Sequence, residues 1–193
     1  MYTYYTKEGK FETYVYDNIP FNILNREDGP AVIYPNGHKQ WRINGERHRE
    51  DGPAVEQSNG TKEWWVNGER HRLDGPAIIY SNDIKKWYKE GKLHRLDGPA
   101  VTTNLGTKQW WVNGERHRLD GPAIVWYSGD KEWWVDGKRH RLDGPAVEWK
   151  NGFKRWYIND KRLDTNEVES WIKSNNTNLK TKQHQALFML MFG

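Results

Sequence analysis

The chain has 193 residues, no cysteine, 29% charged side chains and a formal net charge of +4. The lack of cysteine excludes disulfides, thiolate nucleophiles and cysteine-ligated zinc, and the mild positive charge does not by itself indicate an anionic partner. The mean hydropathy of −1.06 is low, but 12 Trp and 10 Tyr are more than a disordered chain carries. We therefore expect a folded chain whose buried surface comes largely from aromatic rings.

The N-terminal segment contains two strand-like runs, at residues 2–5 and 11–16, but no complete copy of the repeat that follows. The sequence therefore predicts a degenerate N-terminal β cap over residues 1–27. Residues 1–10 lack the apolar core of a secretory signal, and no stretch approaches the ~20 apolar residues that span a bilayer. We expect a cytoplasmic protein with no membrane partner.

A repeat occupies residues 28–163, where the tripeptide Asp-Gly-Pro recurs every 23 residues. The six copies begin at Asp28, Asp51, Asp74, Asp97, Asp120 and Asp143. Each continues with alanine, a short apolar run, a turn signal such as Asn59-Gly60, a run containing tryptophan, and a second turn signal such as Asn67-Gly68. Asn-Gly tolerates the positive φ angles of tight hairpin turns, so each copy is predicted to supply about two strands.

These hairpins predict an all-β repeat protein, an elongated antiparallel array. A closed barrel or propeller is the alternative, although propeller blades usually need about 40 residues per repeat. The glycine of Asp-Gly-Pro is expected to permit a sharp reversal, and the proline to begin a strand, where it needs no hydrogen-bonding partner.

Aromatic residues are expected on both faces of the array because side chains alternate along a strand. The tryptophan present in every copy is expected to form a core stack. The residue that follows it lies on the other face, in the row Trp65, Tyr88, Trp111, Trp134 and Tyr157. That row is either a second packing layer or a platform on which bases or sugars stack with help from nearby cations.

Copies also end in a His-Arg pair shortly before the next Asp. We call these residues phased because they recur at the 23-residue spacing of the repeat. The candidate ligand-binding residues are His71, His94, His117 and His140, with Arg72, Arg95, Arg118 and Arg141. They could bind phosphates, or each Arg could pair with an Asp and set the stacking register of the copies. A metal site is not expected, because one His and one Asp per copy would require ligands from several copies.

The C-terminal residues 164–193 predict a helical cap over the last copy. Asp164 and Glu167 have capping-box spacing. Apolar residues at helical spacing are Val168, Trp171 and Ile172 in a first segment, and Ala186, Leu187, Leu190 and Met191 in a second. Repeat arrays need such a cap over their last open face.

The unit His-Arg-Leu-Asp-Gly-Pro-Ala followed by Trp-Trp-Val-Asn-Gly-Glu-Arg, within residues 26–163, resembles a repeat of uncharacterised proteins of tailed bacteriophages and large DNA viruses. It is more distantly similar to MORN repeats, which share its length, its Trp, Tyr and Gly content and one hairpin per unit. The resemblance implies an elongated antiparallel array used for binding or scaffolding. A viral source would imply an antagonist of a host factor, acting in the host cytoplasm.

No singular catalytic constellation is visible in the sequence. It has no phosphate-binding Gly-x-x-x-x-Gly-Lys loop and no nucleophile elbow, and its carboxylates recur identically in the copies. We therefore expect a protein that is not an enzyme and has no cofactor, and that binds a protein partner or serves as a scaffold. The alternative is a nucleotide or nucleic-acid binder, such as a sponge for a signalling nucleotide, that uses the Trp and His-Arg rows. In either case the variable strand centres, such as Glu56 and Ile79, are expected to provide specificity.

Overall fold

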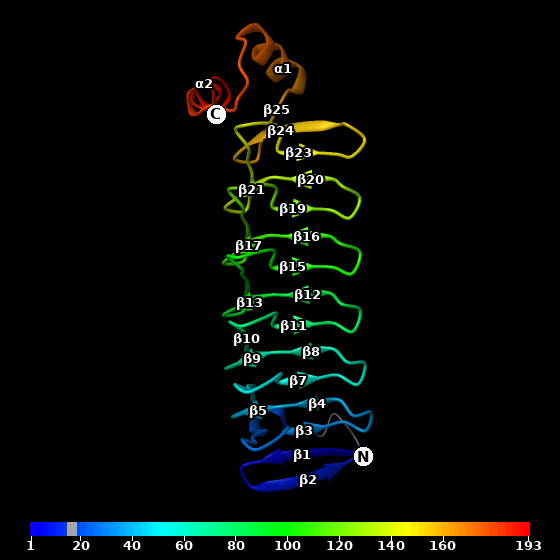
Figure 1. Ribbon diagram of the computed structural model, residues 1–193. Coiled ribbons are helices and arrows are strands. Elements are labelled where there is room, and N and C mark those ends of the chain that lie inside the picture. The colour runs from blue at the N-terminus through cyan, green and yellow to red at the C-terminus, as the bar shows by residue number, and fades with distance from the viewer. Residues whose placement is uncertain (15–18) are drawn as a thin grey trace. The chain divides into compact units, whose positions relative to one another are not determined.

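The chain divides into two units, Met1–His94 and Arg95–Gly193, which are built from the same repeated pair of hairpins (Figure 1). The computed structural model describes residues 1–14 and 19–193. The end of the second strand-like run, Val15 and Tyr16, lies outside the described residues.

Each copy forms two short hairpins, where the sequence predicts about two strands. In the second copy, β7 (Val55–Glu56) and β8 (Lys62–Glu63) form the first hairpin, and β9 (Trp65–Val66) and β10 (Glu69–Arg70) form the second. Trp64 lies between β8 and β9. Its N–H donates to the carbonyl of Ala77 in the next copy (2.8 Å), and its carbonyl accepts from His71 N–H (3.2 Å). The run of residues predicted as one strand therefore bends at this tryptophan and leaves the sheet.

The sheet of the first unit is an antiparallel meander in which neighbouring strands follow chain order after the N-terminal hairpin. Its order is β2 (Gly9–Thr13), β1 (Tyr2–Thr6), β3 (Val32–Ile33), β4 (Lys39–Gln40), β7, β8, β11 (Ile78–Ile79) and β12 (Lys85–Lys86). Beside it lie a 3-10 helix, η2 (Phe21–Ile23), and the separate hairpins β5 (Arg42–Ile43) with β6 (Glu46–Arg47), β9 with β10, and β13 (Tyr88–Lys89) with β14 (Lys92–Leu93). Because β1 pairs with β3, the N-terminal hairpin covers the edge of the first copy, as a cap would.

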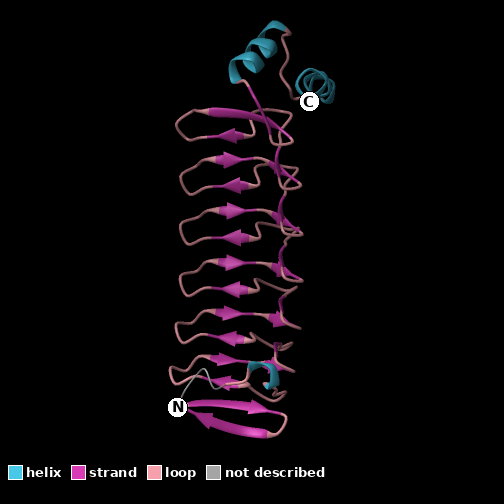
Figure 2. Ribbon diagram, turned by 180° about the vertical axis from the view of Figure 1, so that it is seen from behind, coloured by secondary structure: helices cyan, strands magenta, loops and turns pink. Residues whose placement is uncertain are grey.

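The second unit repeats this arrangement and ends in helices (Figure 2). Its sheet order is β15 (Val101–Thr102), β16 (Lys108–Gln109), β19 (Ile124–Val125), β20 (Lys131–Glu132), β23 (Val147–Glu148), β24 (Lys154–Ile158) and β25 (Lys161–Leu163). The separate hairpins are β17 (Trp111–Val112) with β18 (Glu115–Arg116), and β21 (Trp134–Val135) with β22 (Lys138–Arg139). In the last copy β24 runs unbroken through Trp156, where no following copy takes the tryptophan N–H.

The predicted open hairpin array with a helical C-terminal cap is confirmed. In neither unit do the described strands at the two ends of the sheet pair with each other, so these residues form no closed barrel. The two predicted helical segments are α1 (Thr165–Ser174) and α2 (Lys182–Phe192). Asp164 caps α1 by accepting a hydrogen bond from Glu167 N–H at 2.9 Å, as the capping-box spacing predicts.

The core of the repeats is aliphatic, which corrects the expected tryptophan stack. The alanine of every Asp-Gly-Pro-Ala segment is fully buried: Ala31, Ala54, Ala77, Ala100, Ala123 and Ala146. Of the first tryptophans, only Trp156 is buried, and the others are half-buried. Together with buried strand residues such as Val55 and Ile78, these alanines form the core, and the half-buried rings pack at its side. A second core lies at the cap, where Trp156, Val168 and Phe188 belong to one buried cluster.

Candidate functional site

Each phased arginine donates two hydrogen bonds to the Asp-Gly-Pro segment that follows it, and most also lie over a tryptophan ring. In the second unit, the guanidinium carbon of Arg118 lies 4.0 Å from the centroid of the Trp110 ring. Its Nε donates to Asp120 Oδ1 at 2.8 Å, and Nη1 donates to the carbonyl of Pro122 at 3.3 Å. The equivalent bond to an Asp two residues on is made by Arg26, Arg49, Arg72, Arg95 and Arg141. This arrangement is an Arg–Asp pairing that orders each copy.

The glycine of Asp-Gly-Pro provides room for this guanidinium. Gly75 does not have a left-handed φ, so the sequence-based explanation of a sharp reversal does not apply to it. A Cβ atom on Gly75 would lie 3.0 Å from the Arg72 Cζ, and one on Gly29 would lie 2.8 Å from the Arg26 Cζ. Positive φ angles occur instead at the hairpin turns. Both residues of the second turn adopt them, for example 49° at Asn67 and 75° at Gly68, as predicted, whereas in the first turn of the same copy only Gly60 does (90°).

The phased histidines connect successive copies. His71 Nδ1 accepts from the backbone N–H of Glu90, at the tip of the next copy's second hairpin, at 3.2 Å. His117 Nδ1 likewise accepts from the Asp136 N–H (3.3 Å) and also lies 2.7 Å from Asp136 Oδ1, and His140 Nδ1 lies 2.9 Å from Asn159 Oδ1. The backbone N–H of His94 donates to the Trp87 carbonyl at 3.1 Å, as in the other copies. The imidazoles therefore lie at contacts that determine how one copy stacks on the next.

The second aromatic row is interleaved with arginines. In the first unit, Trp65 has Arg47 on one side (4.9 Å from guanidinium carbon to ring centroid) and Arg70 on the other (4.6 Å). Arg70 also lies 5.6 Å from the Tyr88 ring. The same stacking places Arg116 between Trp111 and Trp134, and Arg139 between Trp134 and Tyr157. The sequence analysis did not identify these arginines, although they recur at the repeat spacing directly before the phased His.

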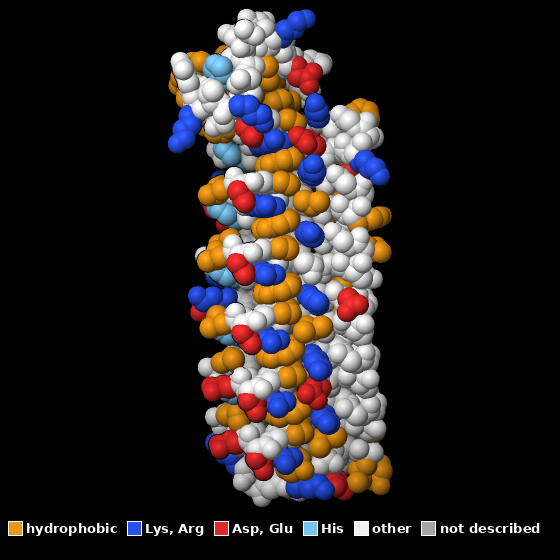
Figure 3. Space-filling model, viewed as in Figure 1, with side chains coloured by type: hydrophobic (Ala, Val, Ile, Leu, Met, Phe, Trp, Pro, Cys, Tyr) orange, Lys and Arg blue, Asp and Glu red, His pale blue; other side chains and the backbone are white. Residues whose placement is uncertain are grey.

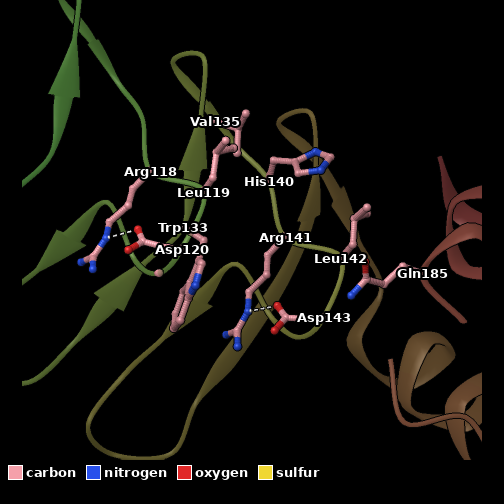
Figure 4. A pocket seen from close by; sticks show the side chains of 11 residues that line it. Arg118, Leu119, Asp120, Trp133, Val135, His140, Arg141, Leu142, Asp143 and Gln185 are labelled. Carbon is pink, nitrogen blue, oxygen red and sulfur yellow. Dashed lines mark hydrogen bonds and ion pairs between the residues drawn. The ribbon is translucent and has the colours of Figure 1, made fainter. Parts of the chain in front are cut away.

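An open groove lies between successive Arg-x-Asp-Gly segments. In the second unit it is lined by Arg118–Gly121 on one side and by His140–Asp143 on the other, with Trp133 and Val135 between them (Figure 4). Figure 4 shows each guanidinium directed toward its own aspartate. The first unit has the same groove between Arg26–Gly29 and His48–Asp51. The groove is thus a product of the repeat itself.

The most exposed recurring side chains at these grooves are leucine and aspartate. The residue between the phased Arg and Asp is Leu73, Leu96 or Leu119, each 78–79% exposed, and Leu142 in the last copy is half-buried. The aspartates beside the three exposed leucines are 81–82% exposed in their side chains. Sequence reasoning did not single out this leucine, although His-Arg-Leu-Asp is repeated unchanged in the sequence.

Ionised carboxylates are favoured along these grooves. The hydrogen bond and the charge of the neighbouring arginine lower the pKa of Asp74, Asp97 and Asp120 below the ordinary aspartate value.

On the face drawn in Figure 3, hydrophobic side chains alternate with Lys and Arg side chains along each unit. The variable strand-centre residues, such as Glu56 and Ile79, are only half-buried within the sheet.

Residues 1–14 and 19–193 contain no group of three His, Asp or Glu side chains placed to hold a metal ion. Neither helix among these residues has the length and apolar character required to cross a bilayer.

Comparison with known proteins assigns no family. Neither protein-family models nor curated proteins match this chain. The resemblance to viral repeats and to MORN repeats therefore stays a prediction.

Proposed function

We propose that this chain is a non-catalytic repeat protein that binds another protein through the exposed leucine–aspartate pairs of each unit. These pairs, called here the leucine–aspartate row, are Leu73 and Asp74 in the first unit, and Leu96, Asp97, Leu119 and Asp120 in the second. One contrast carries the proposal. The recurring Arg and Trp residues are engaged with one another, whereas the recurring Leu and Asp side chains are about four-fifths exposed. A leucine exposed singly is ordinary, but leucines repeated with each copy present a surface.

The spacing of the row suits an extended partner surface. Each copy contributes two strands to the sheet, and neighbouring strands lie about 4.8 Å apart, so equivalent residues within a unit recur about every 10 Å. Apolar side chains beside ionised carboxylates combine desolvation with charge complementarity, as protein interfaces do. The partner thus has a surface that is apolar and basic.

The alternative of a nucleotide or nucleic-acid binder has less support. Phosphate binding requires accessible guanidiniums, but Arg72 and Arg118 donate to their aspartates and lie over tryptophan rings. Base stacking requires an open ring face, but Trp65 lies between Arg47 and Arg70. The exposed aspartates would also repel phosphate.

Catalysis is not part of the proposal because the grooves repeat the same chemistry. Every groove carries the same Arg–Asp pair, and the pKa of Asp74 is lowered for the same reason as that of Asp120. General acid–base chemistry usually needs two titratable groups whose environments differ. If the viral resemblance holds, the partner is a host protein met in the host cytoplasm.

Affinity capture and calorimetry together test this function. The full chain, immobilised by its N-terminus, is expected to retain a stoichiometric protein from the cell that naturally contains it. Nucleotides and oligonucleotides are expected to give no heat in calorimetry at low salt. Binding of a nucleotide or oligonucleotide that weakens steeply with added salt, without protein capture, would replace this function by the alternative.

A further inference from the structure

In the last copy, the C-terminal segment covers the leucine–aspartate pair formed by Leu142 and Asp143. Leu142 packs against the C-terminal core that contains Leu179 and Phe188, and the Lys180 Nζ lies 3.4 Å from the Asp143 Oδ2. The Asp143 side chain is 40% exposed, half the 82% of Asp120. Gln185 of α2 reaches the end of the same groove as Leu142 (Figure 4).

Two adjacent residues of the C-terminal segment take part in this cover. Leu179 is buried in the apolar cluster, and Lys180 pairs with the aspartate. Burial raises the pKa of Asp143, but the hydrogen bond and charge of Arg141, together with Lys180, lower it by more. The covered aspartate therefore stays ionised, with a lysine from outside its own copy as a second cationic partner.

The preceding copies present the same leucine–aspartate pair without this cover. Leu119 and Asp120 in the second unit keep the Arg pairing that the last copy has. Leu73 with Asp74 and Leu96 with Asp97 do the same. At the two equivalent positions that precede the row, glutamate stands in place of the leucine, as Glu27 and Glu50, so the exposed leucines begin at Leu73.

We propose that each uncovered leucine–aspartate pair receives a segment of the partner protein that carries an apolar side chain next to a lysine, as Leu179–Lys180 does in the last copy. This inference rests on the proposed function and specifies the partner's chemistry. The apolar side chain removes the exposed leucine from water, and the ammonium bonds the aspartate carboxylate. The cover of Leu142 and Asp143 is the internal example of the contact.

A synthetic peptide with the sequence of residues 176–193 is the probe. Its binding to the full chain is measured by fluorescence anisotropy, with the variants L96S/L119S and D97N/D120N. The control is L105S/Y127S, which removes two apolar side chains of similar exposure (67% and 68%) from other turns. Because the side chains of Leu96, Leu119, Leu105 and Tyr127 are exposed, L96S/L119S and the control are expected to melt as the parent chain does. D97N/D120N also removes the charge from two Arg–Asp pairs, so its peptide binding is measured at a temperature at which its own melting curve shows it folded.

The proposal predicts that the peptide binds the parent chain and the control equally. L96S/L119S is expected to weaken binding at least tenfold, and D97N/D120N at least threefold with a smaller salt dependence. A peptide carrying Lys180→Glu is expected to bind at least threefold more weakly. Absence of peptide binding, or equal binding by L96S/L119S and the parent chain, would overturn the proposal.

Two further measurements separate this inference from the function on which it rests. If a captured protein partner is retained equally by the parent chain and L96S/L119S, the protein-binding function stands and the inference fails. If the peptide binds as described but no partner is captured, the function fails and the groove chemistry stands. A dimer of the chain alone that L96S/L119S abolishes would show a second copy as the occupant, and would overturn the assignment to a different protein.

Discussion

The Arg118 guanidinium lies over Trp110 at 4.0 Å and bonds Asp120 at 2.8 Å, so one side chain joins an aromatic ring to the start of the next copy. Arg72 makes the same two contacts with Trp64 and Asp74 in the first unit. A guanidinium that is stacked and hydrogen-bonded in this way belongs to the frame, by which we mean the recurring residues that hold each copy and its neighbours together. The recurring residues left for recognition are those that the frame leaves exposed.

Replacing the glycine of an Asp-Gly-Pro segment by alanine tests whether that glycine leaves the space that the arginine guanidinium needs. A Cβ on Gly52 would lie 2.9 Å from the Arg49 Cζ, and one on Gly121 would lie 3.2 Å from the Arg118 Cζ. We expect Gly52→Ala to destabilise the fold by about 1–2 kcal/mol, as overpacking does, and Gly121→Ala by less. Urea denaturation measures both, and an equal loss at the two positions would show that the space for the guanidinium is not the cause.

Truncation of a half-buried tryptophan tests the aromatic layer. Trp110 packs against the buried cluster of Ala123, Ile124 and Trp134 and supports Arg118. Trp110→Ala is expected to lower the free energy of unfolding by about 2–4 kcal/mol. Tyr127→Ala, at an exposed ring, is the control and is expected to change it by less than about 0.5 kcal/mol. An unchanged melting temperature for Trp110→Ala would place this ring outside the frame.

Acid should weaken the frame through the Arg–Asp pairs. The pKa of Asp74, Asp97 and Asp120 is lowered in the folded chain by the hydrogen bond and charge of the arginine. A lowered carboxyl pKa contributes stability that is fully present above the unfolded value of about 3.9 and is lost as pH falls through the folded value. The melting temperature is therefore expected to fall as the pH drops below about 4, where these carboxylates begin to take up protons. In D74N/D97N/D120N the melting temperature should fall less steeply as the pH is lowered. If this variant shows the same dependence of melting temperature on pH as the parent chain, the loss of stability does not come from these Arg–Asp pairs.

The cap depends on Phe188. Its ring centroid lies 5.7 Å from that of Trp156, 5.9 Å from that of Trp171 and 5.1 Å from that of Phe192, and its side chain is fully buried. Phe188→Ala is expected to cost about 3–5 kcal/mol and to increase proteolysis of α1 and α2. Leu190→Ala, at a side chain that is 85% exposed, is the matched control. Equal protease resistance of both variants would contradict the packing.

Features determined by local chemistry could be predicted from the sequence. Asn67-Gly68 forms its turn because both residues accept positive φ, and Asp164 caps α1 because its carboxylate reaches the N–H of Glu167. The bend at Trp64 could not be predicted, because its N–H is taken by Ala77 of the next copy. The role of Gly75 likewise depends on where the Arg72 side chain lies.

The candidate site was predicted only in part. The phased Arg–Asp pairing was one of the two interpretations left open, since complementary charges at constant spacing favour it. That Leu119 is exposed whereas Leu142 is covered by the C-terminal segment could not be predicted, because both leucines lie in the same local sequence, His-Arg-Leu-Asp. The difference between them arises from Leu179, Lys180 and α2, which follow only the last copy.

The most direct test of the central claim is a double-mutant cycle of Arg118→Ala and Trp110→Ala, read as the free energy of unfolding without any ligand. If the recurring Arg and Trp stabilise the frame together, the coupling free energy should favour the parent pair by about 0.5–2 kcal/mol, as a partly desolvated cation–π contact does. A coupling of zero, with Arg118→Ala as stable as the parent chain, would mean that these arginines are free for a ligand and would contradict the account.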